Sequence, residues 1–455
     1  MTLVDDLLAE LDLGRVPVDV VGPTHVLPSP FAVTELASAT VAGATAAAAQ
    51  LAAIRNDDHV GRVLVDRRHA AVAFRSERHL RVGGEAPTLW DPISGYHRAR
   101  DGRWVQLHAN FPHHRAGIVE YLGVDAQREA VSAAIADRDA FELEDALTAR
   151  GLICAALRSL DEWSGHPHAA AHRGEPVVAI ERIGDAPPGA PSPADRPLAD
   201  IRVLDLTRVI AGPVATRTLA AHGADVLRIT SPHRPVVAAA EPDTAWGKRS
   251  AHLDLELPGD RARLDRLVAD ADVFVQSYRP GSLAARGYGA DRLARLRPGI
   301  VHVSVSAFGT GGPWGGRRGF DSICQTATGI AHEGARYRPG DDPRPLPCQA
   351  LDHATGFLAA AGATAALVRR ATEGGSWAVS VSLQRTRDLL VSLGIDHAAE
   401  RGVVAPTHDD VADLLDTRST PFGPVTHVRP PGSIDGVAPR WERPPSPAGS
   451  DRPTW

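Results

Sequence analysis

The chain has 455 residues, 43% of them hydrophobic and 23% charged, and a formal net charge of −6. This length predicts about two to three domains, and the acidic balance argues against a dedicated nucleic-acid binder, whose footprint would be basic. No stretch reaches the roughly 18 uninterrupted apolar residues of a membrane span, and the acidic start MTLVDDLLAELDLGR lacks the features of a signal peptide.

The front of the chain predicts a mixed region followed by a small domain. Residues 1–95 contain a short acidic helix, a Pro-rich turn, an Ala-rich helix at about 35–54 and a strand in RVLVD. Residues 96–183 are predicted to form a compact α+β domain, in which GYHRARDGRWVQLHA is typical of a hairpin with Asp-Gly at its turn. The Pro-rich segment GDAPPGAPSPADRP, 184–197, predicts a linker.

Regular alternation of strands and helices follows the linker. The predicted strands are IRVLDL (201–206), DVLRIT (225–230), DVFVQS (272–277) and IVHVSVSAF (300–308), with helix-like stretches at about 213–222, 259–270 and 283–296. Continuous apolar strands in this order predict an α/β fold with a mostly parallel, Rossmann-like sheet covered on both faces. We assign it to a large domain over 198–395, and the Pro-rich end, 396–455, predicts an extended arm or disorder.

Ligands in such sheets bind beyond the carboxyl ends of the strands. This rule places the loops TRVIAGP, SYRPGS and SAFGTGGPWGGRRGFD at the expected site. Lys248, Arg249, Arg279, Arg317 and Arg318 lie in or beside such loops, where they would suit a phosphate-bearing ligand. The alternative for each of these residues is an ordinary solvated loop charge.

A possible internal repeat connects the two ends of the chain. GATAA occurs at 43–47 and at 362–366, an offset of 319, and each copy lies in an Ala-rich helix that leads into a Val-rich strand. Residues 1–95 would then be a degenerate partial copy of the large domain, with Val33 at the position of Asp352. Chance similarity between Ala-rich helices is the alternative.

Several common kinds of site are not supported by the sequence. The glycine-dense segment 309–316 fits neither dinucleotide-binding nor P-loop spacing, and predicts a flexible loop or a mobile lid. His168 and His172 are four residues apart, but no HExxH pattern or nearby carboxylate completes a metal site. A Ser hydrolase is disfavoured because GxSxG is missing from the sequence.

The cysteines predict a reducing environment. Cys154, Cys324 and Cys348 are widely spaced and include no CxxC pair, so neither a disulfide framework nor a zinc site is indicated. The expected location is the cytoplasm.

Asp352 is the acid at the start of an otherwise apolar helix, PCQALDHATGFLAAAGATAAL. An Asp at this place is ordinarily a helix N-cap that accepts backbone N–H bonds. The same geometry would keep the carboxylate ionised and fixed, as a carboxylate nucleophile requires. The residue pattern alone leaves both interpretations open.

Five motifs in order resemble the class III CoA-transferases of the CaiB/BaiF type. They are IRVLDLTRVIAGPVATRTLAAHGADVLRI, GKRSAHLDL, ADVFVQSYRPGSLAARGYG, VSAFGTGGPWGGRRGFDSICQTATG and LDHATGFLAAAGATAAL, and they cover about 198–385. RARDGRWVQLHANFPHHRAGIVEYLG, with DEWSGHP after it, looks like the small domain that normally follows the large one. This order suggests a trimmed tandem duplication that yields one circularly permuted unit.

The resemblance implies transfer of CoA from an acyl-CoA donor to a carboxylic acid. Asp352 matches the nucleophile, which would pass through an aspartyl anhydride and an aspartyl-CoA thioester. The positions that match CoA contacts are Ile210, Ala211, Lys248, Arg249, Ser277, Tyr278, Arg279, Arg318, Gly319, Phe320 and Asp321. The family implies no permanently bound cofactor, CoA and acyl-CoA as substrates, and a homodimer without nucleic-acid or membrane partners.

Some positions depart from the family pattern. Ile210 stands where some transferases have glutamine, Ser231 replaces a basic residue near Arg234, and Ala285 replaces an arginine that is found one residue late, as Arg286. These changes put the affinity for CoA phosphates and the range of substrates in doubt.

Two alternatives to the transferase remain. A related α-methylacyl-CoA racemase would need a histidine where Phe320 stands, and a catalytically silent CoA-binding homologue would not need Asp352. His353, beside Asp352, is expected to be an ordinary surface histidine, and the alternative is that it orients a partner. The resemblance identifies neither the acyl donor nor the acceptor acid.

Overall fold

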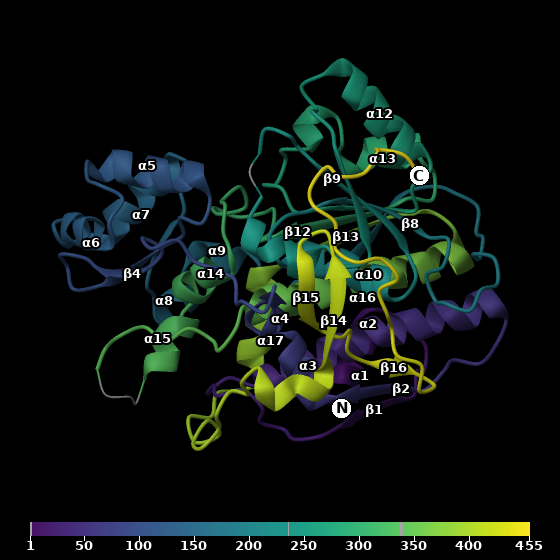
Figure 1. Ribbon diagram of the computed structural model, residues 1–455, viewed down its shortest axis with the longest axis horizontal. Coiled ribbons are helices and arrows are strands. Elements are labelled where there is room, and N and C mark those ends of the chain that lie inside the picture. Colours follow the sequence, from purple (N-terminus) through teal and green to yellow (C-terminus); the bar gives the residue numbers. More distant parts are fainter. Residues whose placement is uncertain (1, 235, 337–339) are drawn as a thin grey trace.

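The centre of the computed structural model, which describes residues 2–234, 236–336 and 340–455, is a seven-stranded sheet (Figure 1). Its strands, in spatial order, are β10 (Lys248–His252), β9 (Asp225–Thr230), β8 (Arg202–Leu206), β11 (Val273–Gln276), β12 (Val301–Ser306), β13 (Ser376–Ser382) and β7 (Ala179–Gly184). All neighbours are parallel except β7, which runs antiparallel to β13. The predicted parallel α/β sheet is confirmed, and the four predicted strands correspond to β8, β9, β11 and β12.

Alternate residues of these strands face two different layers of helices. Val203 and Val303 belong to the core that includes α10 (Ala211–Ala221) and α16 (Ala350–Glu373). Leu204 and Phe274 face the opposite layer, formed by α12 (Pro258–Ala269) and α13 (Ala290–Leu296). Because successive side chains of a strand point to opposite faces, continuous apolar strands require cover on both sides.

The long helix α2 (Val33–Asn56) packs against α16 in the same core (Figure 1). Both helices are rich in alanine, whose small side chain lets two helices approach closely. By length and composition either helix could cross a membrane, but their most apolar windows are 83% and 100% buried inside the protein. The front of the chain is therefore part of the main core.

Short elements surround α2 at the front of the chain. They are α1 (Leu3–Glu10), α3 (Arg67–Ala73), α4 (Ser76–His79), β1 (Val18–Val21) and β2 (Val63–Asp66). β2 pairs with β1 on one side and with β16 (Ser433–Ile434) of the C-terminal region on the other. The predicted strand in RVLVD is confirmed as β2.

A smaller unit with its own apolar core lies to one side of the sheet, on the left in Figure 1. Its antiparallel strands are β4 (Gly95–Arg98), β5 (Trp104–Leu107) and β6 (Cys154–Ala156), and its helices are α5 (Pro112–Leu122), α6 (Arg128–Ala136) and α7 (Ala140–Ala149). Gly102 adopts a positive φ of 79° at the predicted Asp-Gly turn. The predicted hairpin is confirmed.

The end of the range expected for the small domain differs from the prediction. β7, at 179–184, is the edge strand of the large sheet, where its backbone pairs with β13. The next segment, 184–197, is tied to α2, because the Arg55 side chain donates hydrogen bonds to the carbonyls of Ser192 (2.9 Å) and Arg196 (2.9 Å). The Pro-rich segment is thus held at its start by β7 in the large sheet and near its end by Arg55 of α2.

The C-terminal region follows the surface as an ordered arm, drawn in yellow in Figure 1. It contains a hairpin of β14 (Leu415–Thr420) and β15 (Gly423–Val428), which pairs with β3 (Arg81–Val82). The arm then crosses the large domain, where the backbone N–H of Arg440 donates to the Ala221 carbonyl (3.0 Å) and Trp455 Nε1 donates to the Leu267 carbonyl (3.0 Å). Of the two predicted outcomes, the extended arm is the one observed.

Six further α-helices are found in the described part of the chain. They are α8 (Leu160–Ser164), α9 (Pro167–Ala171), α11 (Glu241–Thr244), α14 (Asp321–Ala327), α15 (Ile330–Ala335) and α17 (Leu383–Ser392). β8 has β9 on one side and β11 on the other, so the chain changes direction across the sheet at β8. The carboxyl ends of β8 and β11 flank a crevice of the kind that binds ligands in such sheets.

Candidate active site

Asp352 is the third residue of α16, and its side chain is almost fully buried, with 7% of the residue exposed. The N-cap position is held by Gln349, which makes no side-chain capping bond. Instead, the Asp352 backbone N–H donates to Oδ2 of Asp321 (2.9 Å), the first residue of α14. The interpretation of Asp352 as the N-cap is therefore wrong, because Asp321 satisfies this end of the helix and leaves the Asp352 carboxyl to the site.

Burial and two neighbouring acids affect the charge of Asp352. Burial raises the pKa of Asp352 well above its ordinary value, and the charges of Asp321 and Glu77 raise it further. Burial also raises the pKa of Asp321, to about 6, although the Asp352 N–H and the Gln325 side chain oppose this effect. Neighbouring buried carboxyls share protons in this way. The expectation of a permanently ionised Asp352 is wrong, because desolvation and like charges outweigh the effect of the helix end.

A buried pair lies directly behind Asp352. Glu77 of α4 places Oε2 3.0 Å from Nε2 of His353, and both residues are buried. Burial alone would raise the pKa of Glu77, but the hydrogen bond and charge of His353 hold that pKa below its ordinary value. The His353 ring also stacks on Phe74, with ring centroids 5.6 Å apart. His353 is therefore not a surface residue, because this side of α16 faces α4 and α3.

Asp352 lines a cleft of about 640 Å³ that joins the two halves of the chain. The residues that line the cleft are Glu77, Arg78, Leu89, Trp90, His108, Asn110, Val209, Ile210, Val237, Ala240, Phe320, Asp321, Ser322, Gln349 and Asp352. The aromatic side of the cleft is built on His108, whose ring stacks on Phe320 at 4.0 Å and meets Trp90 edge-on at 5.8 Å.

Sequence reasoning missed the contribution of the front half to this cleft. Glu77, Trp90 and His108 are more than 200 positions from Asp352 in the sequence. His108 lies in the predicted hairpin, GYHRARDGRWVQLHA. The resemblance of this region to the small domain of the family was the only sequence signal for its part in the site. No spacing rule connects residues that only the tertiary fold brings together.

A cluster of arginines lies beside the cleft. Burial lowers the pKa of Arg318, and the nearby positive charges of Arg279 and Arg234 lower it further. Burial likewise lowers the pKa of His113, with added repulsion from Arg318, Arg208 and Arg234. Within the part of the chain that the structure describes, no carboxylate forms an ion pair with Arg234, Arg279 or Arg318. Cations gathered without a carboxylate partner are suited to an anionic group such as phosphate.

The loop after β8 brings other predicted CoA-contact residues to the crevice. Ile210 lines the cleft and Ala211 begins α10. The backbone N–H of Arg208 donates to Ser277 Oγ (3.0 Å), which joins the ends of β8 and β11. Val209, which lies between Arg208 and Ile210 in the sequence, adopts a positive φ of 71°, a conformation that is strained for a β-branched residue. The loop is therefore held in one unusual shape at the edge of the cleft.

The loops after β11 and before α14 carry the rest of the predicted set. Tyr278 is half-buried and its backbone N–H donates to Gln276 Oε1 (2.9 Å), while Arg279 is exposed. Gly319 is required by close packing, since a Cβ there would lie 2.7 Å from the Ala307 side chain. Arg286, the late arginine of this region, is paired with Glu256 at 2.6 Å.

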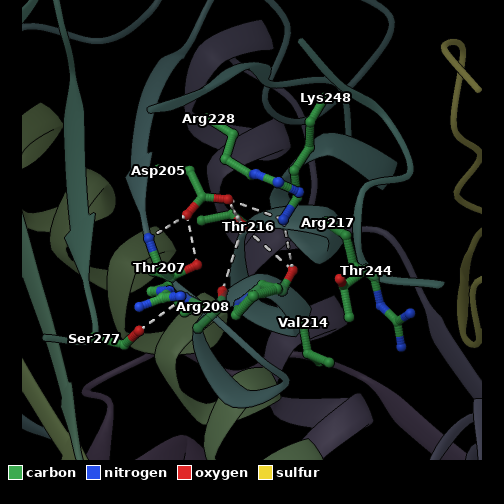
Figure 2. Close-up of polar contacts among 12 residues, drawn as sticks. Asp205, Thr207, Arg208, Val214, Thr216, Arg217, Arg228, Thr244, Lys248 and Ser277 are labelled. Carbon is green, nitrogen blue, oxygen red and sulfur yellow. Dashed lines mark hydrogen bonds and ion pairs between the residues drawn. The ribbon is translucent and has the colours of Figure 1, made fainter. Parts of the chain in front are cut away.

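Lys248 and Arg249 are placed away from the cleft. Lys248 is buried, and its Nζ donates to Asp205 Oδ2 (2.9 Å) and to the Pro213 carbonyl (3.0 Å), as Figure 2 shows. Burial lowers the pKa of Lys248 to about 8, against the raising effect of Asp205. Arg249 donates to Asp225 Oδ2 (2.9 Å) at the edge of the sheet. These two predicted CoA-contact residues therefore do not line the cleft. From β10, the side chain of Lys248 reaches Asp205 of β8 and the side chain of Arg249 reaches Asp225 of β9.

The same network fastens the start of α10. Asp205 of β8 also accepts hydrogen bonds from the Thr207 backbone N–H (2.9 Å) and from Thr216 Oγ1 (2.6 Å), as Figure 2 shows. One buried carboxylate therefore connects the end of β8, the first turns of α10 and the first residue of β10. The loop that presents Ile210 to the cleft is anchored by this network.

The glycine-dense segment 309–316 is attached to α9 and its C-cap. His168 Nε2 donates to the Phe308 carbonyl (2.8 Å), and His168 Nδ1 accepts the backbone N–H of Trp314 (3.1 Å). His172 Nε2 donates to the Gly311 carbonyl (3.1 Å). The two histidines therefore hold this loop in place, and the loop lies against the protein.

Comparison with known proteins identifies related sequences. Residues 198–410 match the family described as "CoA-transferase family III". The acetyl-coenzyme A transferase nodX of Hypoxylon pulicicidum is 39% identical over 208 residues, which cover 45% of this chain and 35% of that protein. An acyl-CoA transferase of Gibberella moniliformis is 31% identical over 323 residues, 66% of this chain and 56% of that protein. The chain thus spans from about a third to just over half of the length of these relatives.

A solved structure is also similar in part. The crystal structure of the hypothetical protein Rv3272 from Mycobacterium tuberculosis has a TM-score of 0.40 and 31% identity, and the match covers 44% of this chain and 56% of that one.

Proposed function

We propose that this chain, whose residues 198–410 match CoA-transferase family III, is an enzyme that transfers CoA from an acyl-CoA donor to a carboxylic acid. In this proposal Asp352 is the nucleophile. The observation that carries it is the position of Asp352, a buried carboxyl that lines a cleft with a cluster of arginines beside it. A pure binding protein would have no need of an acid in this place.

The proposed chemistry uses one side chain as a temporary carrier. An oxygen of the Asp352 carboxylate attacks the thioester carbonyl, the carbon–sulfur bond breaks, and CoA thiolate leaves a mixed anhydride on Asp352. The thiolate then attacks the Asp352 carbonyl, which releases the first acid and forms an aspartyl-CoA thioester. The incoming carboxylate attacks this thioester and expels CoA thiolate, which leaves a second mixed anhydride on Asp352. The thiolate then attacks the acyl carbon of the incoming acid, which forms the new acyl-CoA and releases the Asp352 carboxylate. Covalent catalysis of this kind replaces one difficult exchange by easier steps.

The surroundings of Asp352 support this role. Burial and the neighbouring acids raise the pKa of Asp352, so its carboxylate, once formed, is poorly solvated and reactive. The burial of Asp352, which is 7% exposed, would limit the access of water to an anhydride formed on it. We assign the CoA phosphates to Arg234, Arg279 and Arg318, and Arg234 then supplies the charge that Ser231 lacks. Lys248 and Arg249 are left out of this assignment, since both are engaged within the protein.

Chemical trapping tests the proposal. The protein is incubated with a panel of acyl-CoAs and then treated with hydroxylamine or borohydride, and the modified residue is located by mass spectrometry. We expect an adduct on Asp352. An adduct that is missing with every acyl-CoA, while CoA itself still binds, would overturn the proposal. Asp352→Ala is the control, because it removes the adduct and, since the Asp352 carboxyl caps no helix, leaves the protein folded.

A specific observation favours a second candidate, exchange of the α-proton of an acyl-CoA as in the racemases. Phe320 replaces the histidine expected for a racemase, but His108 stacks on Phe320 at 4.0 Å and lines the same cleft as Asp352. Burial lowers the pKa of His108 to about 4, so its ring is neutral but only weakly basic, and its position in the cleft is what favours this role. The test is whether deuterium from deuterated water replaces the α-proton of a 2-methylacyl-CoA. Exchange by the wild type that is lost in His108→Asn would establish this activity.

We further propose a homodimer in the cytoplasm. The free cysteines, all buried, are compatible with a reducing compartment. Light scattering of the purified protein measures the assembly, and a monomer at working concentration contradicts the dimer. Fractionation of the source cells tests the location.

A further inference from the structure

We propose, on the basis of the function proposed above, that this cleft accepts an uncharged, apolar acyl group and rejects an acyl group that ends in a second carboxylate. The proposal concerns the part of the cleft between Asp352 and the small α+β unit. It rests on three observations. The first two are the charges and the apolar surface of the residues that line the cleft, and the third is that the arginine cluster lies outside this lining.

The charges in the cleft oppose an additional carboxylate. Glu77, Asp321 and Asp352 all line the cleft, and each is less than 10% exposed. Among the described residues that line it, Arg78 carries the only cationic side chain, and Arg78 is exposed to solvent. A second carboxylate would lose its water, face three acids and lack a buried cation, and an unpaired charge in such a place is strongly disfavoured.

The remaining surface of the cleft favours an apolar group. Leu89, Trp90, Val237 and Phe320 contribute apolar and aromatic surface on the side of the small unit and of the segment before α11. His108 adds a neutral ring, because burial lowers its pKa to about 4. Covering such surface with an uncharged acyl chain removes apolar area from water on both sides.

The arginine cluster does not supply the missing cation. Arg208 lies over the Phe111 ring at 4.9 Å, and Phe111 stacks on Phe320 at 6.0 Å. Neither Arg208 nor Arg234 or Arg318 is among the residues that line the cleft. The cluster is therefore beside the cleft, where the proposed function assigns most of it to the CoA phosphates.

The experiment compares two acyl-CoAs of equal chain length. Butyryl-CoA and succinyl-CoA differ at the end of the acyl chain, which is a methyl group in one and a carboxylate in the other. We expect butyryl-CoA to form the Asp352 adduct at least about 100-fold faster at limiting concentration, because the charged end loses hydration without gaining a partner. Equal rates, or faster reaction of succinyl-CoA, overturn the inference while the adduct itself still supports the proposed function. If neither compound reacts, the longer and branched members of the acyl-CoA panel decide: no adduct with any of them contradicts the proposed function and the inference together.

Two variants identify the residues responsible. Leu89→Arg places a cation in the apolar part of the cleft and should reduce the preference for butyryl-CoA over succinyl-CoA by about 10-fold or more, whereas Leu89→Met should keep the preference. Arg78→Ala tests the exposed cation. If the wild-type protein reacts measurably with succinyl-CoA and Arg78→Ala does not, Arg78 binds the second carboxylate and the inference is wrong.

Discussion

Single residues determine the chemistry of the cleft through the location of protons among Asp352, Asp321 and Glu77. Glu77 has its own partner in His353, and its pKa is held below the ordinary value. Asp352 has no comparable cation, and burial and the two neighbouring acids raise its pKa. Protonation is therefore favoured on Asp352 more than on Glu77, which makes nucleophilic attack dependent on pH.

The first prediction concerns this pH dependence. The rate of adduct formation on Asp352 should still be rising with pH above the ordinary titration range of an aspartate, because only the ionised carboxylate attacks and burial raises its pKa. Trapping at a series of pH values measures the rate. Asp321→Asn should move the rise to lower pH, since it removes a neighbouring charge that raises the pKa of Asp352. A rate that does not change with pH contradicts the prediction.

The second prediction concerns stability. Because the pKa of Asp352 is higher in the folded than in the unfolded protein, folding is favoured while Asp352 is protonated, and this contribution is lost as the pH rises above about 4. Asp352→Asn stays neutral at every pH. Its free energy of unfolding should therefore be higher than that of the wild type at pH 8, with little difference between the two proteins near pH 4.

Urea denaturation at both pH values measures the difference. If the Asp352→Asn protein is equally or less stable than the wild type at pH 8, the prediction is wrong, and the Asp352 carboxylate has a stabilising partner.

At the scale of elements, α10 and α16 are placed by buried contacts that no single element contains. The Asp205–Lys248 pair connects β8, β10 and the start of α10, and α16 packs directly against α10. The positions of Ile210 and Asp352 across the cleft depend on these contacts.

The third prediction tests the buried pair. Lys248→Met leaves Asp205 buried without its cation and should lower the free energy of unfolding by about 3–5 kcal/mol. Arg249→Met, whose ion pair with Asp225 is partly exposed, should cost about 1 kcal/mol or less. Equilibrium unfolding in urea compares the two variants. Equal losses would mean that the Lys248 pair adds nothing beyond an ordinary surface pair.

The fourth prediction tests the contact between the two helices. In Gly356→Ala the new Cβ would lie 2.6 Å from the Ala211 carbonyl oxygen and 2.7 Å from the Val214 side chain. The helices must separate, so we expect a loss of about 1–3 kcal/mol in stability and slower Asp352 trapping. Gly259→Ala, in α12, meets nothing within 4 Å and serves as the control. An active, fully stable Gly356→Ala protein contradicts this prediction.

At the scale of the whole molecule, the two halves of the chain form one core and one cleft. α2 packs on α16, β7 completes the large sheet, and Glu77, Trp90 and His108 reach the same cleft as Asp352. The Pro-rich segment 184–197 joins halves that are already attached to each other, since Arg55 of α2 holds its backbone.

The fifth prediction follows from this arrangement. A protease site inserted at the exposed Gly189 should allow the chain to be cut into two pieces that stay together and still form the Asp352 adduct, because the α2–α16 contact is apolar and buried. Size-exclusion chromatography after cleavage measures whether the pieces separate. Separation in the absence of denaturant would show that the halves are independent domains.

Local pattern in the sequence was sufficient for several features of this protein. Apolar runs separated by helical spacing determined the parallel strands β8, β9, β11 and β12, and Asp101-Gly102 determined the hairpin turn. The ordered motifs indicated the family and directed attention to Asp352. These features depend on residues that are close in the sequence, where periodicity and turn preferences act.

Only the tertiary structure decided the charge and the surroundings of the site. Lys248 is an ion-pair partner of Asp205 inside the protein, and His353 is buried against Glu77. The pKa of Asp352 is raised because segments from both halves bury it beside two other acids. Burial and electrostatic interaction depend on the distance between atoms in space, and residues far apart in the sequence supply them here.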